Sequence, residues 1–178
     1  MNDDTNGLVH QFGSDEIAVR AKFIPPQLRV IQDIERDFDL LHFKDSLLNN
    51  YSNSIYFMVT LKPTPNCRVR DLRYFNVTDE KEFDARQRDL HYDMAQCFIL
   101  KTVVREYAPK LCHLEQDFAS GGGLKFILVF VPEKEINQGM DLAAGDLELH
   151  FSDPFFEIPS VQFAFKKQDL KAIPKLKK

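Results

Sequence analysis

The sequence predicts a strand-dominated α+β protein: an antiparallel, immunoglobulin-like β-sandwich with two inserted or flanking amphipathic helices. Several short segments alternate apolar and polar residues, which is typical of half-buried strands. Two segments within the first 100 residues carry apolar residues at helical spacing. Because the final third contains no helical segment, a parallel sheet with regularly alternating helices is disfavoured.

Composition fits a single globular domain. The chain has 178 residues, of which 44% are hydrophobic and 28% are charged. With Phe 16, Tyr 5 and Trp 0, its core must be filled by phenylalanine rings. The net charge of -4 argues against a nucleic-acid partner. The longest apolar run, residues 124–132, is too short for a transmembrane helix and is interrupted by Lys125.

We expect a polar lead-in over residues 1–15, a single globular domain over 16–165 and a lysine-rich tail over 166–178. The tail is typical of a frayed terminus, although its lysines would also suit an anionic surface. The lead-in lacks the basic start and apolar middle of a signal peptide.

The first elements are predicted as a strand, a helix and a strand. Residues 17–24 alternate and end at Pro25–Pro26. A helix follows to Asn49–Asn50, because proline suits a first helical turn. Its apolar face is formed by Leu28, Ile31, Ile34, Phe38 and Leu41. Residues 54–62 are β-branched, aromatic and nearly uncharged, which predicts a central strand.

The middle of the chain is predicted as a polar strand over residues 68–77 and then a second helix. Asp79 and Glu82 form a capping pair at the start of this helix. Residues 97–104 fit either the last turns of the helix or a strand that follows it.

The final third is predicted to contain strands. Residues 110–118 and 124–131 form a hairpin around the three glycines 121–123, which lead into a strand and therefore do not form a phosphate loop. Two further alternating strands are predicted over 146–152 and 161–165.

One set of side chains fits a metal or acid–base site. His113, Glu115 and Asp117 are spaced two residues apart, so a strand would direct all three to one side. An exposed sheet face has the same pattern, and this is the commoner case. His91 and Asp93 are weaker candidates, because residues two apart do not share a helix face.

Phe155 and Phe156 lie in a proline-bounded segment and are the candidate partner-binding residues. Two adjacent rings there either plug the core, which is the more common outcome, or form an exposed anchor.

The three cysteines Cys67, Cys97 and Cys112 are far apart and lack metal or redox spacing. We expect buried thiols. At most one disulfide can form, and which two of the cysteines would form it is left open. A basic group formed by Lys62, Arg68, Arg70 and Arg73 is interrupted by Asp71 and is interpreted as a solvated face.

The second half of the chain resembles a group of bacterial proteins. The similarity is to uncharacterised envelope lipoproteins of Bacteroidetes-type bacteria. It covers residues 111–118, the glycines, Leu-Lys-Phe-Ile-Leu-Val-Phe-Val-Pro and the closing Phe-Ala-Phe-Lys-Lys-Gln-Asp-Leu. The resemblance rests on strand patterning, and the chain lacks their lipobox cysteine at its start. It implies an immunoglobulin-like sandwich with a helical insertion and an extracytoplasmic binding or assembly role, without assigning functional residues.

Two functional hypotheses follow. The first is a non-enzymatic binding or assembly component of the bacterial cell envelope that acts through protein–protein contacts. It places the chain in the periplasm or at the outer membrane, with the cytoplasm as the alternative. It also predicts an exposed apolar patch, with the segment around Phe155 and Phe156 as the candidate. The second is a metal-dependent or acid–base hydrolytic enzyme that uses His113, Glu115 and Asp117. No cofactor is expected under the first hypothesis, and the oligomeric state stays open.

Overall fold

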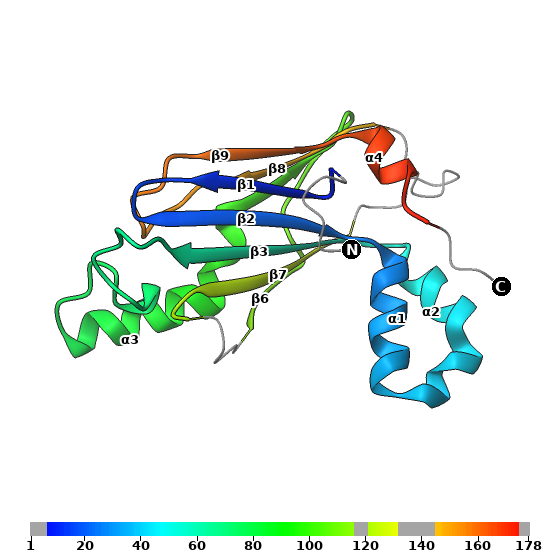
Figure 1. Ribbon diagram of the computed structural model, residues 1–178, viewed down its shortest axis with the longest axis horizontal. Helices are drawn as coiled ribbons and strands as arrows, with labels where there is room; N and C mark the ends of the chain where they lie inside the picture. The colour runs from blue at the N-terminus through cyan, green and yellow to red at the C-terminus, as the bar shows by residue number, and fades with distance from the viewer. Residues whose placement is uncertain (1–6, 116–120, 132–144, 175–178) are drawn as a thin grey trace.

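Two antiparallel sheets face each other across one core (Figure 1). The structure is a computed structural model that describes residues 7–115, 121–131 and 145–174. The first sheet has the order β1 (Val9–Gly13), β2 (Ile17–Ile24), β3 (Ile55–Pro63), β7 (Leu124–Phe130) and β6 (Leu111–Glu115). The second has the order β5 (Glu106–Tyr107), β4 (Phe98–Lys101), β8 (Leu147–Phe151) and β9 (Val161–Phe165).

The predicted class, α+β with antiparallel sheets and helices, is confirmed. The first three strands run consecutively in one sheet, and the β6–β7 hairpin is added beside β3. An immunoglobulin domain instead places its third strand in the opposite sheet. The predicted central strand does lie at the centre, since β3 pairs with both β2 and β7.

Phenylalanine rings join the two sheets. Phe57 on β3 is fully buried, and its ring centroid lies 5.0 Å from that of Phe165 on β9 in the other sheet. Phe57 also contacts Phe23 at 5.6 Å and Phe130 at 6.0 Å within its own sheet. These contacts explain why a core without tryptophan holds together, because large rings each bury much apolar area.

The glycine turn of the β6–β7 hairpin rests against the segment after β3. Gly122 has φ +82°, and a Cβ there would lie 1.9 Å from the Arg70 carbonyl oxygen. Its own carbonyl accepts a hydrogen bond from the Leu72 amide at 2.9 Å. The predicted hairpin is confirmed, but the predicted strand over 68–77 is wrong. That segment holds a short 3₁₀ turn, η3 (Leu72–Tyr74), whose start is capped by Asp71.

The helix predicted from Pro25–Pro26 to Asn49–Asn50 is interrupted. The structure has α1 (Pro26–Arg36), the 3₁₀ helix η2 (Phe38–Phe43) and α2 (Lys44–Tyr51). The interruption falls at Asp37, which is extended and accepts a hydrogen bond from the Asp39 amide. A capping aspartate thus competes with continued helix. We call residues 26–51 the helical arm, which projects from one end of the sandwich (Figure 1).

The second predicted helix and its cap are confirmed. The helix α3 (Glu80–Arg88) begins at Asp79, whose carboxylate accepts the Glu82 amide at 2.8 Å. The Glu82 carboxylate in turn accepts the Thr78 amide at 2.8 Å. The chain continues through the π-helical turn η4 (Asp89–Asp93) and the 3₁₀ turn η5 (Met94–Cys97) into β4, so the region left open after residue 97 is a strand.

Three elements lie in segments for which the sequence predicted none, and one of them is the two-residue strand β5. The strand β1 falls within the predicted lead-in, and its residue Val9 is buried. The short helix α4 (Lys167–Lys171) falls within the predicted tail. Its start is held by Asp146, which accepts the Lys167 amide at 2.8 Å and the Lys166 ammonium at 2.9 Å.

We predict that Phe57→Ala lowers the free energy of unfolding by about 3–5 kcal/mol, because it removes a fully buried ring between the sheets. Tyr92→Ala is the control: this ring is 80% exposed, so its loss should change the free energy by less than about 0.5 kcal/mol. Urea denaturation of both variants measures the difference. Equal effects would contradict the assignment of Phe57 to the core.

Candidate interaction surface

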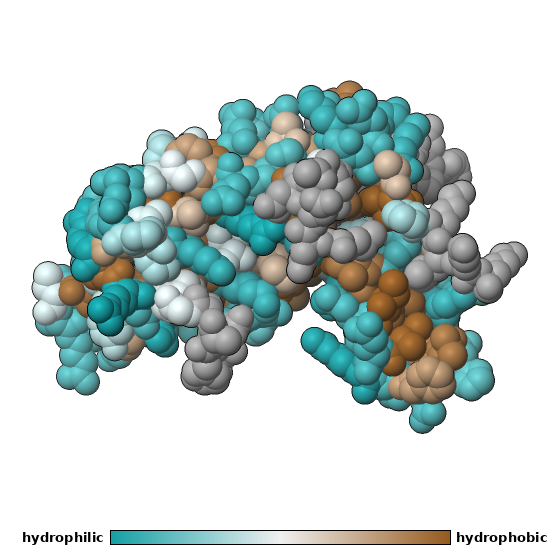
Figure 2. All heavy atoms as spheres, viewed as in Figure 1, coloured by the Kyte–Doolittle hydropathy of each residue, from teal (hydrophilic) through white to brown (hydrophobic). Residues whose placement is uncertain are grey.

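The helical arm displays large apolar side chains to solvent. Phe38 is 74% exposed and Phe43 is 61% exposed. The arm patch, as we call this group, consists of Ile31, Phe38, Leu41 and Phe43. Figure 2 shows apolar residues gathered over the arm, at the lower right of that view. The first hypothesis placed an exposed apolar patch around Phe155 and Phe156, whereas these exposed side chains lie on the arm.

The arm has little core of its own. The helix α1 packs against α2 and η2. Val30 and Pro26 are buried in α1, whereas η2 and α2, which lie wholly within the described residues, contain no buried residue. The apolar residues that predicted one long amphipathic helix therefore fall into two groups. One group packs within the arm, and the other faces solvent.

The root of the arm is held by a polar and aromatic cluster. The Tyr51 hydroxyl donates a hydrogen bond to Asp33, which joins α2 to α1 and raises the pKa of Tyr51. The Arg29 guanidinium lies 5.7 Å from the ring centroids of both Tyr51 and Tyr56. Because Tyr56 belongs to β3, these contacts fasten the arm to the central strand.

Acidic residues are interspersed in the sequence with the residues of the arm patch. Residues 33–45 contain five carboxylates and two cations, which is a net charge of -3 with His42 neutral. The exposed carboxylates form the acidic rim, which consists of Glu35, Asp37, Asp39 and Asp45. The arm therefore exposes both apolar and acidic side chains.

Phe155 and Phe156 lie in different environments. Phe156 is buried and contacts Phe75 edge-on at 5.9 Å, so it plugs the core. Phe155 is half-buried, with the Arg86 guanidinium 4.7 Å from its ring centroid. Asp153 fixes this segment by accepting hydrogen bonds from backbone amides, including that of Phe156 at 2.8 Å. Partner binding by this pair stays a prediction, and it now concerns Phe155.

Two of the three proposed metal residues, His113 and Glu115, lie in the described part of the chain. His113 is exposed on β6, and Glu115 two residues later forms an ion pair with Lys125 on β7. Asp117 lies outside the described residues. Across the described ranges, no group of three or more histidine, cysteine or carboxylate side chains could hold a metal ion.

The weaker pair, His91 and Asp93, lies on the surface of η4. His91 Nδ1 is 2.7 Å from the Gln87 carbonyl oxygen one turn earlier, which is a local contact within the helical segment. The two residues therefore add no ligand set to the metal hypothesis.

Two members of the basic group, Arg68 and Arg73, form ion pairs. Arg68 donates to Glu16 at 2.9 Å and pairs with Glu157 at 3.3 Å. Arg73 pairs with Asp71. The hydrogen bond from the Arg68 side chain lowers the pKa of Glu16 to about 2. These arginines thus stabilise local structure, which agrees with their interpretation as a solvated face.

All three cysteines are free thiols. Burial raises the pKa of Cys97 to about 11 and that of Cys112 to about 12. A nucleophilic cysteine must be a thiolate near neutral pH, and these two are held as thiols. The adjacency of Cys112 and His113 in sequence therefore does not create an activated nucleophile.

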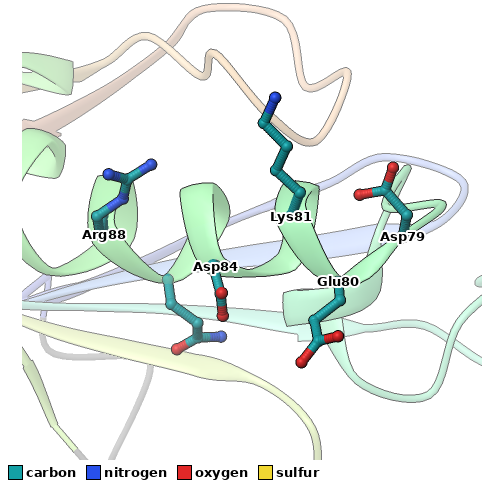
Figure 3. A pocket seen from close by; sticks show the side chains of 6 residues that line it. Asp79, Glu80, Lys81, Asp84 and Arg88 are labelled. Atoms are coloured by element: carbon teal, nitrogen blue, oxygen red, sulfur yellow. The ribbon is translucent and has the colours of Figure 1, made fainter.

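A shallow hollow beside α3 is lined by Asp79, Glu80, Lys81, Asp84, Gln87 and Arg88. Figure 3 shows that these side chains come from one helix and its cap and spread apart from one another. Their charges alternate along the helix, so the hollow does not collect catalytic groups around a shared centre.

Comparison with known proteins leaves the family open. No family model and no curated protein matches the chain. A solved structure of a protein of unknown function from Burkholderia pseudomallei is 13% identical, covers 92% of this chain and 80% of its own, and has a TM-score of 0.38. The resemblance to envelope lipoproteins therefore stays a prediction. Within the described part of the chain, no helix is long and apolar enough to cross a bilayer.

We predict that Glu16→Gln weakens the acid dependence of stability. The carboxylate of Glu16 has a pKa of about 2 in the folded protein and 4.5 ordinarily, so its stabilising effect is complete above pH 4.5 and is lost as the pH falls toward 2. Thermal unfolding between pH 7 and pH 2 measures the slope. Glu80→Gln, an exposed glutamate at the start of α3, is the control and should keep the wild-type slope. An unchanged slope in Glu16→Gln would contradict the Arg68 pairing.

Proposed function

We propose that this protein is a non-enzymatic binding or assembly component that acts through protein–protein contacts of the arm patch. The supporting observation is the exposure of two phenylalanines and two aliphatic residues on one projecting arm. Burying such a side chain is worth roughly 1.5–3 kcal/mol. Proteins that stay monomeric rarely leave large contiguous apolar patches in water, so a patch of this kind marks a contact surface.

The contacts that attach the arm to the central strand favour this role. The Tyr51–Asp33 hydrogen bond and the stacking of Arg29 on Tyr51 and Tyr56 hold the two helices on the central strand. A surface that is already ordered loses less conformational entropy when it binds. The arm therefore presents Phe38 and Phe43 in a fixed arrangement.

We place this role in the bacterial cell envelope, either in the periplasm or at the outer membrane. This location rests on the resemblance of the second half of the chain to envelope lipoproteins. The cytoplasm is the alternative, and three free thiols favour it, because disulfides are uncommon in reducing compartments. Fractionation of native cells with antibodies to the protein separates the two locations.

We predict that the double variant Phe38→Asp, Phe43→Asp folds normally but loses its partner. Both rings are exposed, so the midpoint of thermal unfolding at low protein concentration should change little. In the complex, both rings would be buried against the partner, so replacing them with charged side chains should remove binding. The measurement is affinity capture from extracts of the native organism with wild-type and variant protein, followed by mass spectrometry.

The matched control is Val103→Asp, Val104→Asp. These valines are also largely exposed but lie in the turn between β4 and β5 of the other sheet. The control should capture the same proteins as the wild type. Identical captured sets for wild type and arm variant would contradict the proposed function.

A further inference from the structure

The carboxylates of the acidic rim have no cationic partner in the described part of the chain. On the sandwich, by contrast, Glu16 and Glu157 both pair with Arg68. Across the described residues, none of the ion pairs includes a carboxylate of the rim. Residues 33–45 carry a net charge of -3, which is most of the -4 of the whole chain. The negative charge of the protein is thus concentrated on the arm that also exposes the apolar patch.

Two rim carboxylates flank an exposed ring of the arm patch. Phe38 is 74% exposed, and Asp37 and Asp39 are its neighbours in the chain. Because consecutive Cα atoms are only about 3.8 Å apart, a partner that covers Phe38 also comes close to both carboxylates. Negative groups of the partner would be repelled there, and positive groups would be attracted. The partner must therefore be positive where it covers the patch.

Another part of the chain shows which cation suits a ring beside carboxylates. The Arg68 guanidinium lies 4.7 Å from the ring centroid of Phe75, and the same guanidinium pairs with Glu16 and Glu157. A planar guanidinium can stack on a ring and bond carboxylates at the same time, whereas an ammonium is a compact point charge. Phe38 also has carboxylates beside it, but within the described residues no guanidinium stacks on it.

The charge of the arm argues against two other occupants of the patch. Nucleic acids and bilayers that contain anionic lipids are both negative, so the rim would repel them. A bilayer of neutral lipids would cover the apolar side chains but would bring no net positive charge to the carboxylates. A basic protein segment satisfies the apolar side chains and the carboxylates together.

We propose that the partner of the arm patch is a basic protein segment that carries arginine. Its apolar side chains cover Phe38 and Phe43, and its guanidinium groups pair with the carboxylates of the acidic rim. The apolar contact supplies most of the affinity, and the charges select the partner and speed its association. This inference rests on the proposed function and names the chemistry of the partner.

The first test uses three synthetic peptides as probes. Each is an amphipathic helix of about 14 residues with leucine along one face, and its other face carries arginine, lysine or glutamate. Fluorescence anisotropy of the labelled peptides at low salt measures their binding to the full chain. The arginine peptide should bind, the lysine peptide should bind several-fold more weakly, and the glutamate peptide more than about tenfold more weakly. Equal binding of the arginine and glutamate peptides, or binding of none of the three, would overturn the inference.

Two variants locate the binding on the arm. Phe38→Ser, Phe43→Ser keeps the charge of the arm and should weaken binding of the arginine peptide more than about tenfold. Glu35→Lys, Asp39→Lys should invert the preference, so that the glutamate peptide binds more tightly than the arginine peptide. All four side chains are exposed, and thermal unfolding checks that both variants fold.

The matched control is Asp84→Lys, Asp93→Lys. It changes the net charge by the same amount, with exposed carboxylates of α3 and η4. This variant should keep the wild-type preference for the arginine peptide. A control that loses the preference as fully as the rim variant would show that only the overall charge matters, and the inference would fall.

Vesicles test the bilayer as the occupant. The wild-type chain should not bind vesicles of phosphatidylcholine, either alone or mixed with phosphatidylglycerol. Binding to vesicles without binding to the arginine peptide would overturn the basic partner.

The two proposals fail in different ways. Captured proteins that are lost in the Phe38→Asp, Phe43→Asp variant but retained in Glu35→Lys, Asp39→Lys would overturn the basic partner and leave the proposed function supported. Captured sets that are identical for the wild type and the Phe38→Asp, Phe43→Asp variant would overturn the proposed function itself.

Discussion

The contact between Phe57 and Phe165 is the constraint on which the rest of the structure depends. It joins the central strand of one sheet to an edge strand of the other, and it extends to Phe23 and Phe130. Successive residues of a strand point to opposite faces, so the strand that carries Phe57 into the core carries Tyr56 on its other face. Tyr56 receives Arg29 from the arm. The strand β3 therefore contributes both to the core and to the attachment of the helical arm.

Where local patterns decide structure, the sequence predicted it well. The strands β3, β7, β8 and β9 alternate clearly, and the Asp79 cap depends only on residues within one turn. Of the two misses, one has a local cause and the other a long-range cause. Asp37 satisfies the amide of Asp39 and ends a helix that apolar spacing alone would continue. The segment after β3 is shaped by the close approach of Gly122 to Arg70, which is a long-range contact that no periodicity reveals.

The candidate surface was harder to predict, because helical spacing does not say what an apolar face contacts. Phe38 and Leu41 were counted toward a core-facing stripe, yet the break at Asp37 turns them toward solvent. In the proline-bounded pair, Phe156 is buried, which is the outcome that the sequence favoured. Solvent exposure is a property of tertiary packing. The flanking of Phe38 by Asp37 and Asp39 was the available local signal, because adjacent charges disfavour burial.

The electrostatics of the described residues serve local structure. The clearest pKa shifts have structural causes: Glu16 is lowered by its hydrogen bond to Arg68, and Cys97 and Cys112 are raised by burial. Active sites instead gather perturbed groups around a cleft. Here the carboxylate Glu115 and the arginine Arg68 are paired with neighbours, whereas the apolar side chains of the arm patch face water. The proposed function therefore rests on the exposure of that patch, because covering apolar side chains that face water is favourable.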